Sequence, residues 1–253
     1  MPAEGTTAKV AGIIPARWGS SRFPGKPLHL LAGKSLLQHV YERVNKCQQV
    51  DLLLVATDDI RIKEEASSFG AEVVMTSPEH PTGTDRIAEA VGPHPEITHV
   101  INIQGDEPLV NPALVDSLAA ILKNEPGLSM ITAANPMAEL DQLDDPDIVK
   151  VVVDGAGNAL YFSRSPLPYL RTHPDALTPL RHMGLYGYRR DFLEQFVSWP
   201  PGLLEQAEQL EQLRALEHGT RIRVILTDDH SIGLDTPEQV PHLEALLAAC
   251  KSP

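Results

Sequence analysis

The chain has 253 residues, and its 21 lysines and arginines against 34 aspartates and glutamates give a formal net charge of −13. This acidic balance argues against a general nucleic-acid binder, because such proteins hold the phosphate backbone with clustered positive charge. No apolar run approaches the roughly 20 residues that a membrane helix needs, and the polar N-terminus lacks the apolar stretch of a signal peptide. We therefore expect a cytoplasmic protein that binds neither nucleic acid nor a membrane.

The basic residues are unevenly placed along the chain. Residues 1–34 hold five basic residues and one acidic residue, a balance of +4 that leaves −17 for the remainder. A short cationic segment on an otherwise acidic protein is thus the first feature that needs an explanation.

Short apolar runs alternate with helical patterns through the first half of the chain. The runs are bounded by polar or turn residues, as in strands covered on both faces, and they span residues 10–14, 52–56, 73–75, 100–103 and 129–133. The helical patterns between them span residues 36–44, 60–69, 85–91 and 112–123. Strand and helix alternating at this spacing predict an α/β fold with an open, mostly parallel, Rossmann-like sheet.

The second half of the chain changes in character. Residues 149–153 and 159–163 flank a glycine-rich turn and predict an antiparallel hairpin. Beyond a proline-rich loop, the patterns predict a strand over 182–188, a helix over 203–217, a strand over 222–226 and a last helix from Pro237. Because no low-complexity linker divides the chain, we expect one domain over residues 1–253 with an inserted antiparallel lobe at about 145–200.

The cationic segment forms the loop after the first predicted strand, residues 15–27. Its glycines let backbone N–H groups approach a ligand, and Arg17, Arg22 and Lys26 can neutralise phosphates. A solvated surface loop is the plainer interpretation. The spacing from Gly19 to Gly25 is one residue too long for a P-loop, and no Gly-x-Gly-x-x-Gly follows the strand. Neither a P-loop NTPase nor a dinucleotide-dependent dehydrogenase is therefore supported.

Two acidic motifs lie further along the chain. Asp106 follows the fourth predicted strand within Gln-Gly-Asp-Glu-Pro, and Asp235 lies in Gly-Leu-Asp-Thr-Pro-Glu. Carboxylates opposite a phosphate loop suit Mg²⁺, which typically bridges one or two carboxylates and the substrate's phosphates. The alternatives are a simple turn at Asp106 and a helix cap formed by Asp235 or Thr236.

Four segments together resemble one family of enzymes. They are the Ile-Pro-Ala-Arg-x-x-Ser-x-Arg-x-Pro-Gly-Lys pattern ending at Lys26 and residues 83–86, 104–108 and 233–237. Their order and spacing are similar to those of the 3-deoxy-manno-octulosonate cytidylyltransferases, also called CMP-Kdo synthetases, over about residues 10–240. Residues 161–164 and 181–188 resemble the sugar-binding lobe of that family. Each segment alone is a weak signal, whereas the joint match is specific.

This resemblance implies a reaction in which CTP and 3-deoxy-D-manno-octulosonate (Kdo) give CMP-Kdo and diphosphate, activating Kdo for lipopolysaccharide synthesis. It implies a nucleotide-diphospho-sugar transferase fold and a homodimer built through the lobe at about 145–200, which would also bind the sugar. Mg²⁺ is the implied cofactor, and CTP and Kdo are the implied small-molecule partners.

The resemblance also implies roles for individual residues. The CTP site would comprise Pro15, Ala16, Arg17, Arg22, Lys26, Gly83, Thr84 and Gln104, with the three cations on the phosphates. Mg²⁺ would bind Asp106 and Asp235, which form the catalytic set with Arg17 and Lys26. The sugar acid would contact Arg86, Arg164, His182, Tyr186, Glu211 and Gln212.

Several of these sugar-site residues have plainer interpretations. A lone histidine on a strand, such as His182, is more often a structural hydrogen-bonding residue than a ligand contact, although Tyr186 would project from the same face. Glu211 and Gln212 lie on a helix with an apolar stripe, so they could simply belong to its exposed face.

Two rival functions stay open at this level. A cytidylyltransferase for another sugar acid, such as 8-amino-Kdo or a sialic acid, would share the phosphate loop, although residues 161–164 and 182–188 favour Kdo. A non-catalytic nucleotide-binding or carbohydrate-binding protein on the same fold is the second rival. The presence of both Asp106 and Asp235 counts against it, since a binder needs no metal pair.

Overall fold

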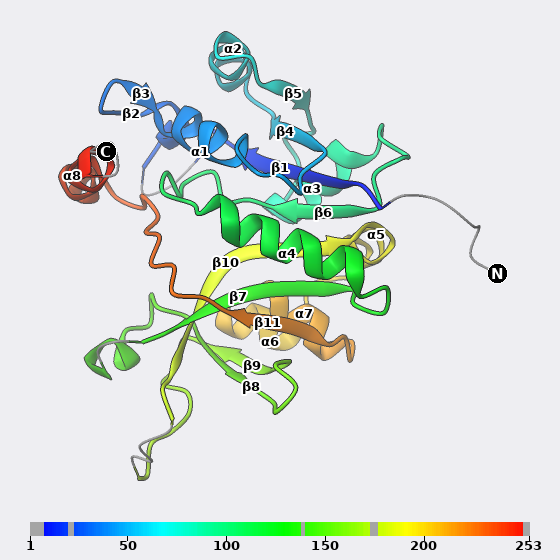
Figure 1. The fold of residues 1–253 in the computed structure, drawn as a ribbon, viewed down its shortest axis with the longest axis vertical. Coiled ribbons are helices and arrows are strands. Elements are labelled where there is room, and N and C mark those ends of the chain that lie inside the picture. The colour runs from blue at the N-terminus through cyan, green and yellow to red at the C-terminus, as the bar shows by residue number, and fades with distance from the viewer. Residues whose placement is uncertain (1–7, 20–22, 138–139, 173–176, 250–253) are drawn as a thin grey trace. The chain divides into compact units, whose positions relative to one another are not determined.

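The computed structural model describes residues 8–19, 23–137, 140–172 and 177–249, and the chain forms two compact units (Figure 1). The first unit comprises residues 1–119 and 231–253, and the second comprises residues 120–230. The lobe expected at about 145–200 falls within the second unit; its extent and the single domain stay predictions. Across the ranges given above, no helix combines the length and apolar character that crossing a bilayer requires.

The first unit is built on a parallel sheet. Its strands lie in the order β6 (His99–Asn102), β1 (Val10–Ala16), β4 (Leu52–Thr57) and β5 (Glu72–Met75). Its helices are α1 (Leu36–Val44), α2 (Ile60–Ser68), α3 (Gly83–Val91) and α8 (Val240–Ala249), while α4 (Pro112–Asn124) runs on into the second unit. Two short 3₁₀ helices (Lys26–Leu28 and Pro237–Gln239) and the small hairpin of β2 (Leu30–Leu31) and β3 (Lys34–Ser35) complete it.

The apolar runs explain this sheet. Val10, Ile13 and Ile14 of β1 are fully buried, as expected for a strand between two neighbours with both faces covered. Asn102 at the end of β6 pairs with Ile13, and Thr57 at the end of β4 pairs with Ala16. The carboxyl ends of these strands therefore lie at one edge, where open α/β sheets bind ligands.

The second unit is built on a mixed sheet. In it, β7 (Met130–Pro136) lies between the parallel β11 (Ile222–Leu226) and the antiparallel β10 (Leu180–Arg189). The predicted hairpin is formed by β8 (Lys150–Val153) and β9 (Ala159–Ser163), and β8 also pairs with β10. The helices are α5 (Arg190–Ser198), α6 (Leu203–Glu208) and α7 (Gln212–Glu217), with a 3₁₀ turn at Leu140–Asp144.

The single helix predicted over 203–217 is wrong, because the chain breaks there into α6 and α7. Gln209 adopts a left-handed conformation with φ of 54°, which ends α6. The break lets Arg214 of α7 return to Glu205 of α6, with two buried hydrogen bonds of 2.8 and 2.6 Å. A buried ion pair thus spans the point where the predicted helix breaks.

The α/β fold class predicted from the sequence is confirmed by these two units. The parallel strands of the first unit alternate with helices along the chain, and the antiparallel hairpin lies in the second unit (Figure 1).

Candidate active site

A cavity of about 330 Å³ lies in the first unit, where β1 ends and the loop after β6 begins. Nine of the residues predicted from the sequence line it: Pro15, Ala16, Arg17, Lys26, Gly83, Arg86, Gln104, Asp106 and Asp235. Thr84 is buried in the first turn of α3 and is not part of the lining. Arg22 lies outside the described residues. The cavity therefore gathers the expected nucleotide and metal residues, together with one expected sugar contact.

Close packing of two backbone segments forms the floor of this cavity. A Cβ atom on Gly105 would lie 2.9 Å from the Pro15 carbonyl oxygen. This distance is shorter than a normal contact, so the two backbone segments would have to move apart. Only glycine therefore lets the loop after β6 lie directly against the end of β1.

Lys26 is positioned by the fold of the cationic loop. Gly25, just before it, has φ of 72°, and its N–H donates to the Trp18 carbonyl over 3.1 Å. A side chain at Gly25 would meet the Trp18 ring at 2.8 Å, and the Arg61 guanidinium also lies against that ring, 3.3 Å from its centroid. The hydrogen bond from Gly25 to Trp18 closes the loop, and the short 3₁₀ helix begins at Lys26.

The two carboxylates expected to bind a metal converge on the Lys26 ammonium. Lys26 Nζ lies 2.6 Å from Asp106 Oδ2 and 3.6 Å from Asp235 Oδ1. The Leu234 N–H donates to the Asp106 carbonyl over 2.8 Å, which ties the segment before Asp235 to the loop after β6. Residues more than a hundred positions apart in the sequence thus offer oxygens to one cation.

The helix-cap interpretation of Asp235 is not supported by the geometry. The cap position before the 3₁₀ helix belongs to Thr236, and Gln239 Oε1 accepts from the N–H groups of Asp235 and Thr236 at 2.6 and 3.0 Å. The Asp235 carboxylate instead lies near the Lys26 ammonium, and the Asp235 side chain is 47% exposed.

The start of α3 forms another wall of the cavity. Thr82 caps this helix, accepting from the N–H groups of Thr84 and Asp85 at 3.2 Å each. Arg86, one turn further on, is only 3% exposed, donates to Thr76 and lies 3.4 Å from Asp58. Its charge is therefore already engaged inside the first unit.

Four lining residues were not predicted from the sequence: Pro27, His80, Thr82 and Gly105. Thr82 carried a signal, because a threonine directly before Gly83 and three residues before Asp85 fits a helix cap. His80 carried none, since its place in the wall depends on its contact with Glu89 of α3.

In the second unit, His182 and Tyr186 of β10 lie together, with ring centroids 5.3 Å apart. The register between β10 and β7 shifts between Met183 and Tyr186, a bulge of the kind that re-aims side chains. Thr132 Oγ1 lies 3.1 Å from His182 Nε2. Burial, and secondarily the Arg181 charge, lowers the pKa of His182 to about 3, so its imidazole is neutral at ordinary pH.

Glu211 lies close enough to Tyr186 to affect the pKa of its hydroxyl. Burial raises the pKa of Tyr186 well above its usual value, and the nearby Tyr188 and Glu211 add to the rise. Gln212 follows Glu211 at the start of α7 and is only 5% exposed, so it does not belong to an exposed helical face. Its Nε2 atom has no hydrogen-bond partner among the described residues.

Arg164 is held by α6 and the loop before β8. Its Nε donates to the Glu208 carbonyl over 2.9 Å, and an Nη atom donates to the Pro146 carbonyl over 2.8 Å. The Glu208 carboxylate accepts from the Arg164 N–H and from Ser163 Oγ at 3.0 and 2.6 Å. No interaction in the described structure joins Arg164 to His182 or Tyr186.

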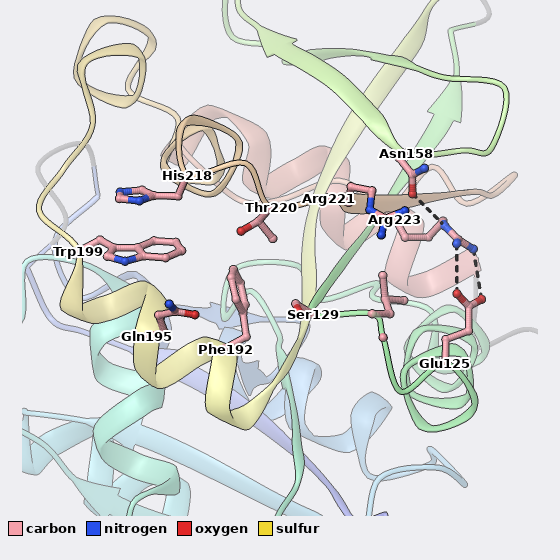
Figure 2. A pocket seen from close by; sticks show the side chains of 12 residues that line it. Glu125, Ser129, Asn158, Phe192, Gln195, Trp199, His218, Thr220, Arg221 and Arg223 are labelled. Atoms are coloured by element: carbon pink, nitrogen blue, oxygen red, sulfur yellow. Dashed lines mark hydrogen bonds and ion pairs between the residues drawn. The ribbon is translucent and has the colours of Figure 1, made fainter.

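A second cavity of about 460 Å³ lies within the second unit and contains none of the predicted site residues. Figure 2 shows Trp199 stacked on His218, with ring centroids 3.9 Å apart, and Arg223 facing Glu125 at 3.1 and 3.2 Å. Thr220 and Arg221 line it just before β11 starts, away from the carboxyl ends where such sheets bind ligands. We therefore take the cavity of the first unit as the candidate active site.

Known proteins resemble this chain over nearly its whole length. Residues 11–222 match the family model described as cytidylyltransferase. The 3-deoxy-manno-octulosonate cytidylyltransferase of Syntrophotalea carbinolica is 46% identical over 94% of this chain and 98% of its own, and that of Geobacter sulfurreducens is 48% identical over 91% and 96%.

Solved structures agree with the sequence relatives. A CMP:2-keto-3-deoxy-manno-octonic acid synthetase complexed with CTP matches with a TM-score of 0.91 and 40% identity, over 96% of this chain and 99% of its own. A cytidylyltransferase from Leptospira borgpetersenii, at 18% identity and a TM-score of 0.67, shares the fold over 97% of this chain and 89% of its own. The predicted nucleotidyltransferase class is thereby confirmed, and the chain belongs to the cytidylyltransferase family and, within it, to the 3-deoxy-manno-octulosonate cytidylyltransferases, or CMP-Kdo synthetases.

Proposed function

We propose that this protein carries out the reaction of its family, in which CTP and Kdo give CMP-Kdo and diphosphate, with the cavity of the first unit as the CTP site. The product is the activated form of Kdo for lipopolysaccharide synthesis. One observation carries the placement: Arg17, Lys26, Asp106 and Asp235 line the same cavity at the carboxyl ends of parallel strands.

Cationic side chains would bind the phosphates of CTP, and mainly backbone groups would bind its cytidine. Arg17 and Lys26, with Arg22 from the same loop, would contact the phosphates of CTP. The backbone at Pro15 and Ala16, with Gln104 and the Gly83–Thr84 segment, would line the cytidine pocket. The tight contact at Gly105 supports this assignment, because it leaves the ends of two strands close enough to hold one ligand.

The carboxylate pair fits a divalent cation. Asp106 and Asp235 both reach one ammonium, so a single ion at that place can contact both, and carboxylate oxygens are the ligands Mg²⁺ prefers. Within the described ranges no group of three or more acidic, histidine or cysteine side chains could hold a metal, so substrate oxygens or water would complete the shell. Mg²⁺ bound there would neutralise phosphate charge and lower the pKa of a coordinated hydroxyl.

The residues of the chain would then support an in-line displacement. The anomeric hydroxyl oxygen of Kdo attacks the α-phosphorus of CTP, the bond to the β-phosphate oxygen breaks, and diphosphate leaves as the hydroxyl proton passes to solvent. Arg17 and Lys26 would offset the negative charge that grows on the leaving diphosphate, where preorganised positive charge most favours the transition state. No covalent intermediate on the protein is required.

Within the second unit, the proposed contacts of the sugar acid are Arg164, His182, Tyr186, Glu211 and Gln212. The neutral His182, the Tyr186 hydroxyl and the buried Gln212 amide suit hydroxyl groups of a sugar, while arginine suits its carboxylate. A homodimer built through the lobe at about 145–200 and a cytoplasmic location complete the proposal.

A substrate panel tests this function. CTP and the other nucleoside triphosphates are each mixed with Kdo, 8-amino-Kdo or sialic acid in the presence of Mg²⁺, and diphosphate formation is measured. We expect release with CTP and Kdo above all other pairs. Faster diphosphate release with a sialic acid would show that Kdo is not the preferred substrate. No release with any sugar acid would contradict the proposal that the protein is an enzyme.

A further inference from the structure

Lys26 and the proposed Mg²⁺ draw on the same oxygens. The Lys26 ammonium is 2.6 Å from Asp106 Oδ2, the length of a charge-assisted hydrogen bond, and 3.6 Å from Asp235 Oδ1. Its side chain is only 14% exposed, so this contact is not a loose surface pairing. A divalent cation bound to both carboxylates would lie next to this ammonium, and the two positive charges would repel each other.

Lys26 could also pair with the phosphates of a bound nucleotide. It lines the cavity proposed for CTP, and Arg17 lines the same cavity. Phosphate oxygens entering there would offer the ammonium a new anionic partner. The lysine can thus be neutralised either by the carboxylates or by the nucleotide.

We propose that Lys26 and the divalent cation compete for Asp106 and Asp235, and that CTP ends this competition by drawing Lys26 onto its phosphates. This inference rests on the proposed function, since it takes the two carboxylates as metal ligands. It assigns Lys26 the added role of setting the order of binding. The cation binds weakly to the protein alone and tightly once CTP is present.

The consequence is measurable as a coupling between ligands. Coupling between two binding sites typically changes affinity about 5–150-fold, and the effect is reciprocal. Removing the ammonium should therefore tighten cation binding to the protein alone, by about five- to tenfold at the lower end of that range. CTP should then increase cation affinity less in the variant than in the unchanged protein.

The test uses Mn²⁺ as the probe, with its free concentration read by electron paramagnetic resonance in the absence of nucleotide. Lys26→Met is compared with Lys34→Met, a matched control whose ammonium makes a 2.6 Å contact with Glu42 elsewhere in the unit. We expect tighter Mn²⁺ binding for Lys26→Met and no change for Lys34→Met. Lys26→Arg keeps the charge and should bind Mn²⁺ no more tightly than the unchanged protein.

Two further arms separate the possible failures. The double change Lys26→Met with Asp106→Asn should lose the gain, because the gain depends on the carboxylate. If Lys26→Met folds less well, Mg²⁺ should raise its melting temperature more than that of the unchanged protein. Equal Mn²⁺ affinity in Lys26→Met and the unchanged protein would overturn the competition while leaving the proposed function standing. An absence of Mn²⁺ binding in every variant would also overturn the competition, whereas an absence of diphosphate release in the substrate panel would overturn the proposed function with it.

Discussion

At the scale of single residues, the assignment depends most on Asp235. Its carboxylate lies on the Lys26 side of the cavity, while Thr236 and Gln239 provide the cap of the following helix. Its position is set by the backbone bond from Leu234 to Asp106, which a change of side chain leaves in place. A change of the Asp235 side chain should therefore affect catalysis without affecting the fold.

Asp235→Asn should lose turnover while keeping its fold. Changes to residues that only support metal ligands cost about 10–100-fold, so loss of a ligand should lower kcat by at least about a hundredfold. The initial rate of diphosphate release and the melting temperature measure the two effects, with the exposed Asp141→Asn as control. A near-normal Mg²⁺-dependent rate would show that Asp235 does not bind the metal.

His182 makes stability depend on pH. The folded protein holds its pKa at about 3 against 6.5 for an ordinary histidine, so between these values the unfolded chain binds a proton that the folded chain does not. Stability from this residue is thus complete above pH 6.5 and falls as pH drops, by about 1–2 kcal/mol at pH 5.

Replacing His182 by asparagine should flatten this part of the pH profile. Urea unfolding at pH 7 and pH 5 measures it, and the exposed His242→Asn is the matched control. An unchanged difference in unfolding free energy between the two pH values would contradict the lowered pKa of His182 in the folded protein.

At the scale of elements, an apolar run identifies a strand that is covered on both faces, as β1 illustrates. The same reasoning fails over 203–217. The apolar stripe there continues through Gln209, and neither glycine nor proline marks the break between α6 and α7. Across this break Glu205 pairs with Arg214, a tertiary contact that periodicity does not report.

That ion pair should be worth more to folding than a surface pair. Arg214 is 3% exposed, so Arg214→Met would leave the Glu205 carboxylate without its counter-charge, at a cost of about 3–5 kcal/mol in unfolding free energy. Replacing both residues, as in Glu205→Leu with Arg214→Met, should recover much of this loss. Lys34→Met, which breaks an exposed pair, should cost about 1 kcal/mol or less. A double variant no more stable than Arg214→Met would refute the explanation.

The contact between the end of β1 and the loop after β6 can be tested at Gly105. Alanine there would meet the Pro15 carbonyl at 2.9 Å, so the two segments must separate, at a cost of about 1–3 kcal/mol. CTP affinity should fall with it, because both segments line the cavity. Gly155→Ala, whose Cβ has no atom within 4 Å, is the control. Unchanged calorimetric CTP binding in Gly105→Ala would argue against this floor.

At the scale of the whole molecule, the uneven charge now has a local explanation. The net charge of −13 repels a nucleoside triphosphate, whereas the segment that carries +4 contributes Arg17 and Lys26 to the cavity. Lys34 of that segment pairs with Glu42 instead. The cationic residues are therefore divided between the proposed phosphate site and ordinary surface pairing.

The proposed nucleotide residues were more predictable from the sequence than the proposed sugar contacts. Arg17, Gln104 and Asp106 follow strands directly, and strand ends converge in any parallel sheet. His182 lies beside a bulge and Gln212 follows a helix break, and no local sequence pattern predicts either feature. The contact of Lys26 with both carboxylates was not foreseen either, because it joins three segments through one backbone bond.

The central claim is transfer of CMP to Kdo, and the phosphorus NMR spectrum of a reaction mixture tests it most directly. With the protein, CTP, Kdo and Mg²⁺, we predict a phosphodiester signal of CMP-Kdo and a diphosphate signal growing in equal amounts as CTP disappears. Asp106→Asn should leave the CTP signals in place. Formation of CDP and phosphate, or of free CMP without a sugar phosphodiester from the start of the reaction, would contradict the account.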